Sequence, residues 1–235
     1  MIAAGQQITT SNMYNDKTDK EILEVLEQHA LLTFESQLQL KEEINRRGLS
    51  LDISSLDAAI DDKIARIKNF EYLKDFGFKA ETIDNRFLVT RTLNAVLTDV
   101  FAVLLGLVAF FIGINGAINL VLTFINGDEV DVFTLAVKFA MAGLLFVGIR
   151  FFSGLKRLFD YAGFELARKN GEITLKKRFD IKLEEIQAKP SDLILHREED
   201  DLGLQLGNEV IFTSNAENLI QRMTLEELTK RLKGN

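Results

Sequence analysis

An uncharged stretch from Val100 to Gly127 constrains this chain more than any other part of it. The stretch reads VFAVLLGLVAFFIGINGAINLVLTFING and holds no Asp, Glu, Lys or Arg. The hydrocarbon core of a bilayer is about 30 Å thick, and roughly 20 apolar residues cross it as a helix. A soluble core helix this long would carry polar residues on one face. The sequence therefore predicts a helix that spans a membrane.

A second apolar segment follows after a short link, from Val132 to Phe152. Only Lys138 and Arg150 interrupt it. The link is too short for the chain to do anything but turn back at once. We therefore expect two antiparallel spanning helices that form a hairpin.

The link between the two segments is acidic. Residues 124–133, FINGDEVDVF, contain three acids and neither Lys nor Arg. The nearby basic residues lie on the other side of both segments, at Lys79, Arg86, Arg91, Arg150, Lys156, Arg157, Arg168 and Lys169. Lys and Arg near spanning helices are kept on the cytoplasmic side. We expect the hairpin to cross the inner membrane. Both termini should then lie in the cytoplasm, and the acidic loop should lie outside.

Small residues recur at three- and four-residue spacing in both segments. They are Gly106, Ala109, Gly113 and Gly116 in the first, and Ala136, Ala140 and Gly143 in the second. Small residues on one face let helices approach closely in lipid. The pattern predicts a hairpin that packs on itself through Gly106, Gly113, Gly116, Ala140 and Gly143, or an interface between copies of the chain.

Three polar residues inside the segments are candidate functional residues. Lys138 lies six residues from the outer end, about 9 Å deep in a helix. Asn119 lies at a similar depth on the first helix, and Asn115 lies one turn deeper. We expect Lys138 to hydrogen-bond the Asn119 side chain; the alternatives are that Lys138 extends to the outer headgroups or lines an ion path. At the inner edge we expect Asp99 to pair with Arg150.

The N-terminal region, residues 15–79, is predicted to be helical. Thr18 and Glu21 form a capping box that opens a short first helix. A second helix is expected from Phe34 to Arg47, ending at Gly48. A third is expected from Ser54 or Ser55, ending at Gly77. The interpretations are a small docking module or a stalk without a partner.

Residues Lys17 to Leu49 resemble a short helical motif found near the ends of many Bacteroidota membrane proteins. In that motif a second helix ends in Glu-Leu-x-Arg-Arg-Gly-Leu, and here Ile44 and Asn45 depart from it. The match covers about a seventh of the chain. The resemblance implies a bacterial source and no particular chemistry.

The C-terminal region changes to a two-residue period. Ile173, Leu175, Phe179, Ile181 and Leu183 alternate with polar residues, as in a half-buried strand. A turn at Pro190, a short strand at Leu193 and Leu195, and a hairpin marked by Gly203 and Gly207 follow. Ser214 to Glu217 is a second capping-box pattern, which predicts a terminal helix.

This C-terminal part is similar to bacterial pleckstrin-homology-like modules that follow two membrane spans. The residues that carry the similarity are FFSGLKRLFD, then FELARKNGEITLKKRFDIKLEEI, and a late amphipathic helix. The resemblance implies a curved sheet capped by one helix, used for assembly or protein contact.

Together these patterns predict a membrane α-helical hairpin with a small all-α N-terminal region and a small α+β C-terminal cytoplasmic domain. The expected parts are a helical region at 1–79, the hairpin with juxtamembrane helices at 80–160, and a β-rich domain with a C-terminal helix at 161–235.

No catalytic, cofactor-binding or metal-binding residue is predicted. The chain has no Cys and only two His, and it lacks phosphate-loop, dinucleotide-binding, zinc-protease and calcium-loop motifs. Residues 15–79 hold ten basic and fourteen acidic residues, which argues against nucleic acid as a partner. We expect a non-enzymatic membrane anchor for interaction domains, with an unidentified protein or copies of itself as partner. The alternatives are an oligomeric channel or transporter subunit, and a toxin-immunity or defence protein.

Overall fold

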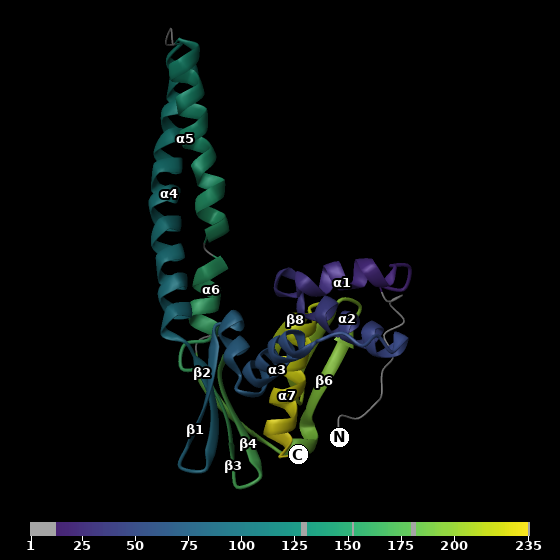
Figure 1. Cartoon of the computed structure of the whole chain (residues 1–235). Coiled ribbons are helices and arrows are strands. Elements are labelled where there is room, and N and C mark those ends of the chain that lie inside the picture. Colours follow the sequence, from purple (N-terminus) through teal and green to yellow (C-terminus); the bar gives the residue numbers. More distant parts are fainter. Residues whose placement is uncertain (1–12, 128–130, 152, 180–181, 235) are drawn as a thin grey trace. The chain divides into compact units, whose positions relative to one another are not determined.

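The structure, a computed structural model, describes residues 13–127, 131–151, 153–179 and 182–234 (Figure 1). The chain divides into two compact units. Unit 1 combines the residues up to Tyr72 with Ile194–Arg231, and unit 2 contains Leu73–Leu193 with the last four residues. Two segments far apart in sequence therefore build unit 1, and most of unit 2 lies between them.

The N-terminal part of unit 1 is helical, as the sequence predicts. Thr18 and Glu21 form the expected capping box, and Gly48 ends the second helix at a φ of +65°. The third helix ends at Lys68, earlier than predicted, and a short 3-10 turn follows before Gly77. The elements are α1 (Asp19–Glu27), η1 (His29–Leu31), α2 (Phe34–Arg47) and α3 (Ser54–Lys68), and the turn η2 (Glu71–Phe76) lies where unit 2 begins.

A buried carboxylate ties α2 to the segment that precedes α1. The Glu43 side chain is fully buried and accepts hydrogen bonds from Arg46 and Arg47. Arg47 also donates to three backbone carbonyls, those of Tyr14, Asn15 and Lys17. The hydrogen bond from Arg46, supported by that from Arg47, lowers the pKa of Glu43 to about 2. The Glu-x-x-Arg-Arg part of the N-terminal motif therefore acts as an internal clamp.

Three strands and a helix from the C-terminal end complete unit 1. The strands form one sheet in the order β6-β7-β8, and Leu219, Ile220 and Met223 of the helix pack against the core of the N-terminal helices. The elements are β6 (Leu193–Glu198), β7 (Asp201–Leu206), β8 (Glu209–Asn215) and α7 (Leu219–Lys233), with a 3-10 turn η3 (Pro190–Asp192) before them.

The second predicted capping box is wrong. Ser214 lies inside β8, and its buried hydroxyl donates to the carbonyl of Leu202 on β7. The helix begins four residues later than that pattern suggested, where the Asn218 side chain accepts from the backbone N–H of Gln221. The strand continues through Ser214 because its backbone pairs with Leu202 across the sheet.

Unit 2 contains a five-stranded antiparallel sheet in the order β1-β2-β3-β4-β5. Two-residue turns connect β1 to β2 and β3 to β4: Asp84 and Asn85 both have positive φ, as do Asn170 and Gly171. Such turns match the twist of antiparallel strands. The strands are β1 (Phe78–Ile83), β2 (Arg86–Arg91), β3 (Glu165–Lys169), β4 (Glu172–Phe179) and β5 (Lys182–Ala188).

The helical hairpin is an insertion in this sheet. Neighbouring strands β2 and β3 are antiparallel partners, with Val89 opposite Leu166, yet three helices separate them in sequence. Those helices are α4 (Leu93–Asn126), α5 (Val132–Phe151) and α6 (Ser153–Asp160). Both ends of the hairpin are therefore fixed to adjacent strands of one sheet (Figure 1).

The structure corrects the expected division at 1–79, 80–160 and 161–235. No helix precedes α4 at residues 80–91, because those residues form most of β1 and β2. The predicted single strand from Ile173 to Leu183 is two strands, β4 and β5, with Ile181 outside the described residues. The α+β region thus consists of two sheets that belong to different units.

The Glu43 clamp predicts a measurable loss of stability in unit 1. Glu43→Gln leaves two arginines without their carboxylate and should destabilise α2 by about 2 kcal/mol, which corresponds to roughly 30-fold faster amide exchange. Hydrogen exchange of α2 in the full chain measures this. The neighbouring Glu42, which is exposed, provides the control variant Glu42→Gln.

The same clamp predicts a pH dependence. The folded-state pKa of Glu43 is depressed, so its stabilisation is present above the ordinary value of 4.5 and is lost as the pH falls through about 2. In Glu43→Gln this part of the acid destabilisation should be absent, and in Glu42→Gln it should remain. An identical acid profile for Glu43→Gln and the unsubstituted chain would contradict the assignment.

Candidate functional site

The two long helices α4 and α5 touch through their backbones. A Cβ added at Gly113 would lie 2.2 Å from the Leu145 nitrogen, and one at Gly148 would lie 2.7 Å from the Phe110 nitrogen. Contacts this short leave no room for any side chain larger than hydrogen at these two positions. Glycine is therefore required where the helices meet, as the packing of helices in lipid favours.

The predicted packing residues divide into two groups. Gly106, Gly113 and Gly116 are buried against α5. Ala140 and Gly143 lie on the exposed side of α5, and a Cβ at Gly143 would meet no atom within 4 Å. The contact on α5 is made by Met141, Leu145, Gly148 and Phe151 instead. The three- and four-residue spacing of Met141, Leu145 and Gly148 was available in the sequence.

These contacts fix the register of the hairpin. Gly113 lies opposite Leu145, and Gly116 lies opposite Ala142. Because the helices are antiparallel, Lys138 is level with Leu120. Further toward α6, direct contacts place Asp99 beside Gly154 and Arg157. We call the end near Gly127 the tip of the hairpin and the end near Leu93 its base.

Near the tip, the polar side chains form a chain of hydrogen bonds. Lys138 Nζ donates to Thr123 Oγ1 at 2.6 Å, and Thr123 Oγ1 donates to the Asn119 carbonyl at 2.8 Å. Asn119 Nδ2 donates to Asn115 Oδ1 at 2.7 Å. The three predicted residues thus lie in one cluster, and buried Thr123, which the sequence reasoning missed, connects them.

The bond predicted between Lys138 and the Asn119 side chain is replaced by the bond to Thr123. Side chains on a helix tilt toward its N-terminus, and the N-terminus of α5 is at the tip. From its position level with Leu120, the Lys138 side chain therefore reaches one turn further out, to Thr123. Asn115 and Asn119 are left on the exposed surface of α4.

At the base, Asp99 is 3% exposed and pairs with two arginines. Its partners are Arg91 at the end of β2 and Arg157 on α6, the latter at 3.3 Å. The expected partner Arg150 lies about two helical turns nearer the tip, because the register places it level with Val108. Asp99 thereby connects the sheet to both arms of the hairpin.

The Arg91 guanidinium lies over the ring of Tyr161, with its Cζ 4.9 Å from the centroid. Tyr161 makes edge contacts with Phe78 and Phe164, with centroids 5.2 and 5.6 Å apart. Cation–π contact favours this placement of a guanidinium. Burial raises the pKa of Tyr161, so its phenol stays protonated at neutral pH.

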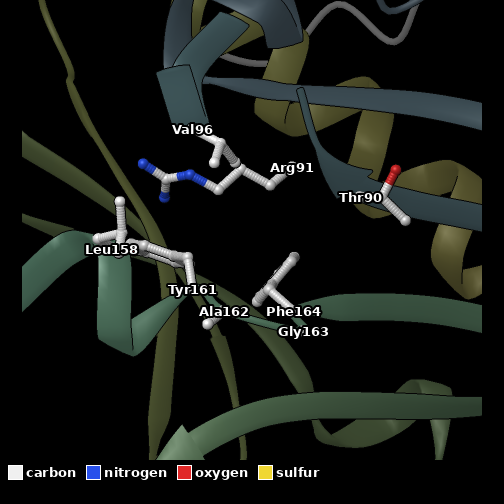
Figure 2. A pocket seen from close by; sticks show the side chains of 8 residues that line it. All are labelled: Thr90, Arg91, Val96, Leu158, Tyr161, Ala162, Gly163 and Phe164. Carbon is white, nitrogen blue, oxygen red and sulfur yellow. The ribbon is translucent and has the colours of Figure 1, made fainter. Parts of the chain in front are cut away.

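A cavity of about 390 Å³ lies beside this group (Figure 2). Arg91 and Thr90 line it together with Tyr161, Phe164 and the apolar side chain of Leu158. The lining offers one cation, a hydroxyl and a protonated phenol among apolar walls. Asp99 already balances the charge of Arg91, so the cavity is polar at one edge without a strong net charge.

The described residues do not assemble a metal site. Among them, no group of three or more His, Cys, Asp and Glu side chains is arranged to hold a metal ion. Comparison with known proteins finds no matching family model, no matching curated protein and no matching solved structure. The two resemblances noted in the sequence therefore stay predictions.

The backbone contact at Gly113 predicts a position-specific effect of side-chain size. Gly113→Val forces α4 and α5 apart and should lower the stability of the hairpin by about 1–3 kcal/mol. Gly143→Val makes the same chemical change where there is open space and should change stability by about 0.5 kcal/mol or less. Unfolding of the two variants by SDS in mixed micelles compares them. Equal midpoints would contradict the packing described above.

The Asp99 group predicts that its two arginines matter unequally. Asp99→Leu leaves Arg91 buried without a counter-charge and should destabilise unit 2 by about 3–5 kcal/mol. Arg157 has a side chain that is 62% exposed, so Arg157→Met should cost at most about 1 kcal/mol. Denaturant unfolding of the full chain in detergent measures both. A larger loss for Arg157→Met than for Asp99→Leu would show that the burial is misassigned.

Proposed function

We propose that this chain is a non-enzymatic protein of a bacterial inner membrane. In this account α4 and α5 cross the bilayer, and both units place their remaining elements in the cytoplasm, where they contact a protein partner. The hairpin acts as the anchor, and the sheets and short helices supply the surfaces for contact.

The observation that carries the proposal is the exposure of apolar surface on the two helices. Both are long and apolar enough to cross a membrane, yet only 11% and 6% of their most apolar windows are buried inside the protein. The core helix of a soluble protein would be mostly covered. Large side chains remain uncovered on both arms, including Phe101 at 64% and Phe146 at 75% exposure. Contiguous apolar surface of this extent favours a lipid environment.

The distribution of charge supports the orientation. Arg91, Lys156 and Arg157 lie at the base of the hairpin, and α4 carries no Lys or Arg at all between Leu93 and Asn126. The base would therefore face the cytoplasm. α4 has 34 residues, a length of about 51 Å, so its first turns would extend beyond the hydrocarbon core into the headgroup region.

Exposed features of each unit support a role in protein contact. Leu31 in unit 1 is 83% exposed. In unit 2, β1 and β5 are the outer strands of the five-stranded sheet, and outer strands offer backbone groups to an added strand. These surfaces are where we expect a partner to bind.

A channel or transporter subunit is the second candidate function, because Asn115 and Asn119 are polar residues on the exposed surface of an apolar helix. The polar cluster occupies only the half of α4 nearest the tip. On the same face nearer the base lie Leu105, Val108 and Ile112, so a path along this face is not polar throughout. A defence protein that uses the acidic loop depends on Asp128 and Glu129, which lie outside the described residues.

Labelling of single cysteines tests the proposed topology, since the chain has no Cys of its own. Asn126→Cys, at the tip, should react with a membrane-impermeant maleimide in spheroplasts, whose inner membrane is intact. Ser50→Cys, exposed between α2 and α3, should react only after the inner membrane is permeabilised.

The chain without substitutions is the control for background labelling. Labelling of Ser50→Cys in intact cells would show that the orientation is the opposite of the one proposed. If neither variant were labelled before permeabilisation, the proposal that the hairpin spans the membrane would be contradicted.

A further inference from the structure

One exposed face of α4 repeats every three and four residues. Leu105, Val108, Ile112, Asn115, Asn119 and Leu122 follow this spacing, and all six are on the surface. We call this set the Asn seam. The spacing is the seven-residue repeat by which two helices wind around each other with a left-handed twist.

The contact between α4 and α5 uses the same repeat. On the face of α4 that meets α5, the buried residues Asp99, Gly106 and Gly113 are seven apart, as are Gly116 and Thr123. A straight α-helix drifts by about 20° per seven residues, but a helix already wound about its partner with this repeat does not drift relative to it. The Asn seam therefore keeps a constant position beside the α5 contact along the hairpin.

The two asparagines leave hydrogen-bonding groups unused. Each side-chain amide has two N–H donors and an acceptor oxygen, and the pair makes one bond between Asn119 Nδ2 and Asn115 Oδ1. In hydrocarbon, an amide without partners costs several kcal/mol. An amide is its own complement, because it both donates and accepts.

The seam ends toward the base in a hollow. Asn94, Thr98, Phe101 and Leu105, which continue the same spacing, line an apolar depression of about 620 Å³ together with Phe151 of α5. A neighbouring helix could insert its own side chains there. The seam therefore combines a helix-pairing repeat, self-complementary polar groups near the tip and space for packing near the base.

We propose that α4 pairs with α4 of a second copy of this chain through the Asn seam. The inference rests on the proposed function, since it needs both copies in one bilayer. Copies inserted with the same topology have parallel α4 helices, so each seam residue meets its own equivalent across a two-fold axis along the membrane normal. Asn115 then faces Asn115 and Asn119 faces Asn119, and their amides bond across the interface.

A second copy fits this face better than a different partner. The seam carries no charged residue, so it cannot form an ion pair with a helix that carries charged side chains. Polar asparagines within an apolar seam fix the register and the number of helices in parallel assemblies. Polar pairs of this kind also hold helices together in lipid.

Disulfide crosslinking in native membranes tests the pairing. The variants are Leu122→Cys and Ile112→Cys on the seam, with Val121→Cys as the matched control at the same depth; Val121 is 55% and Leu122 is 45% exposed. With copper phenanthroline as oxidant, the two seam variants should give at least about fivefold more covalent dimer than Val121→Cys, because disulfides need Cβ atoms about 4 Å apart.

A second set of variants tests the amides. Asn115→Leu and Asn119→Leu together, in the Leu122→Cys background, should lower the dimer yield by about tenfold at low expression. Ile118→Leu, on a neighbouring exposed position, should leave the yield unchanged. Equal crosslinking at Val121 and Leu122, or a yield that is insensitive to loss of both amides, would overturn the proposal.

The cell fraction that contains the cysteine variants distinguishes a failure of the proposed membrane location from a failure of the pairing. If the cysteine variants appear in the soluble fraction, the proposed function itself fails. If they remain in membranes and Leu122→Cys gives no dimer, only the pairing through the Asn seam fails.

Discussion

The close backbone contact between α4 and α5 determines most of what surrounds it. Gly113 against Leu145 and Gly148 against Phe110 fix which residues stand opposite each other. From that register follow the bond from Lys138 to Thr123 and the placement of Arg157 beside Asp99. The same register directs Asn115 and Asn119 away from α5. The glycines therefore decide which polar groups are bonded between α4 and α5 and which stay exposed.

The sheet of unit 2 likewise fixes where the base of the hairpin begins and ends. Because β2 and β3 are neighbours, the chain enters α4 and leaves α6 at adjacent points. Asp99 adds a charged connection at the same place through Arg91 and Arg157. The base of the hairpin is therefore joined to the sheet twice, by the chain itself and by this charged group.

The sequence was sufficient for features that depend on local chemistry. The start of α1 at Thr18 and the end of α2 at Gly48 follow from side chains within a few residues of those points. The two long apolar helices follow from composition alone. The turns at Asp84-Asn85 and Asn170-Gly171 were equally local, and attention to Asn170-Gly171 would have predicted β3 ahead of the strand expected from Ile173.

Non-local pairings could not be derived in the same way. Val89 pairs with Leu166 across the whole hairpin, and no short-range pattern announces a partner that far away. Residues 80–91 were therefore assigned to the hairpin instead of to β1 and β2. The elements β6–β8 and α7 were assigned to one domain with β3–β5, whereas Ile194–Arg231 belong to unit 1. Ser214 shows the converse error, since a good capping pattern gave way to pairing with Leu202. For Ala140 and Gly143, spacing showed that small residues share a face but not which face meets α4.

The central claim is that the exposed apolar surface of α4 and α5 lies in a bilayer, and alkaline carbonate extraction of native membranes tests it most directly. High pH releases proteins held by charge and leaves those held by buried apolar surface. The account predicts that the chain stays with the lipid pellet until detergent is added. Release of the chain into the carbonate supernatant as a monodisperse protein would contradict it.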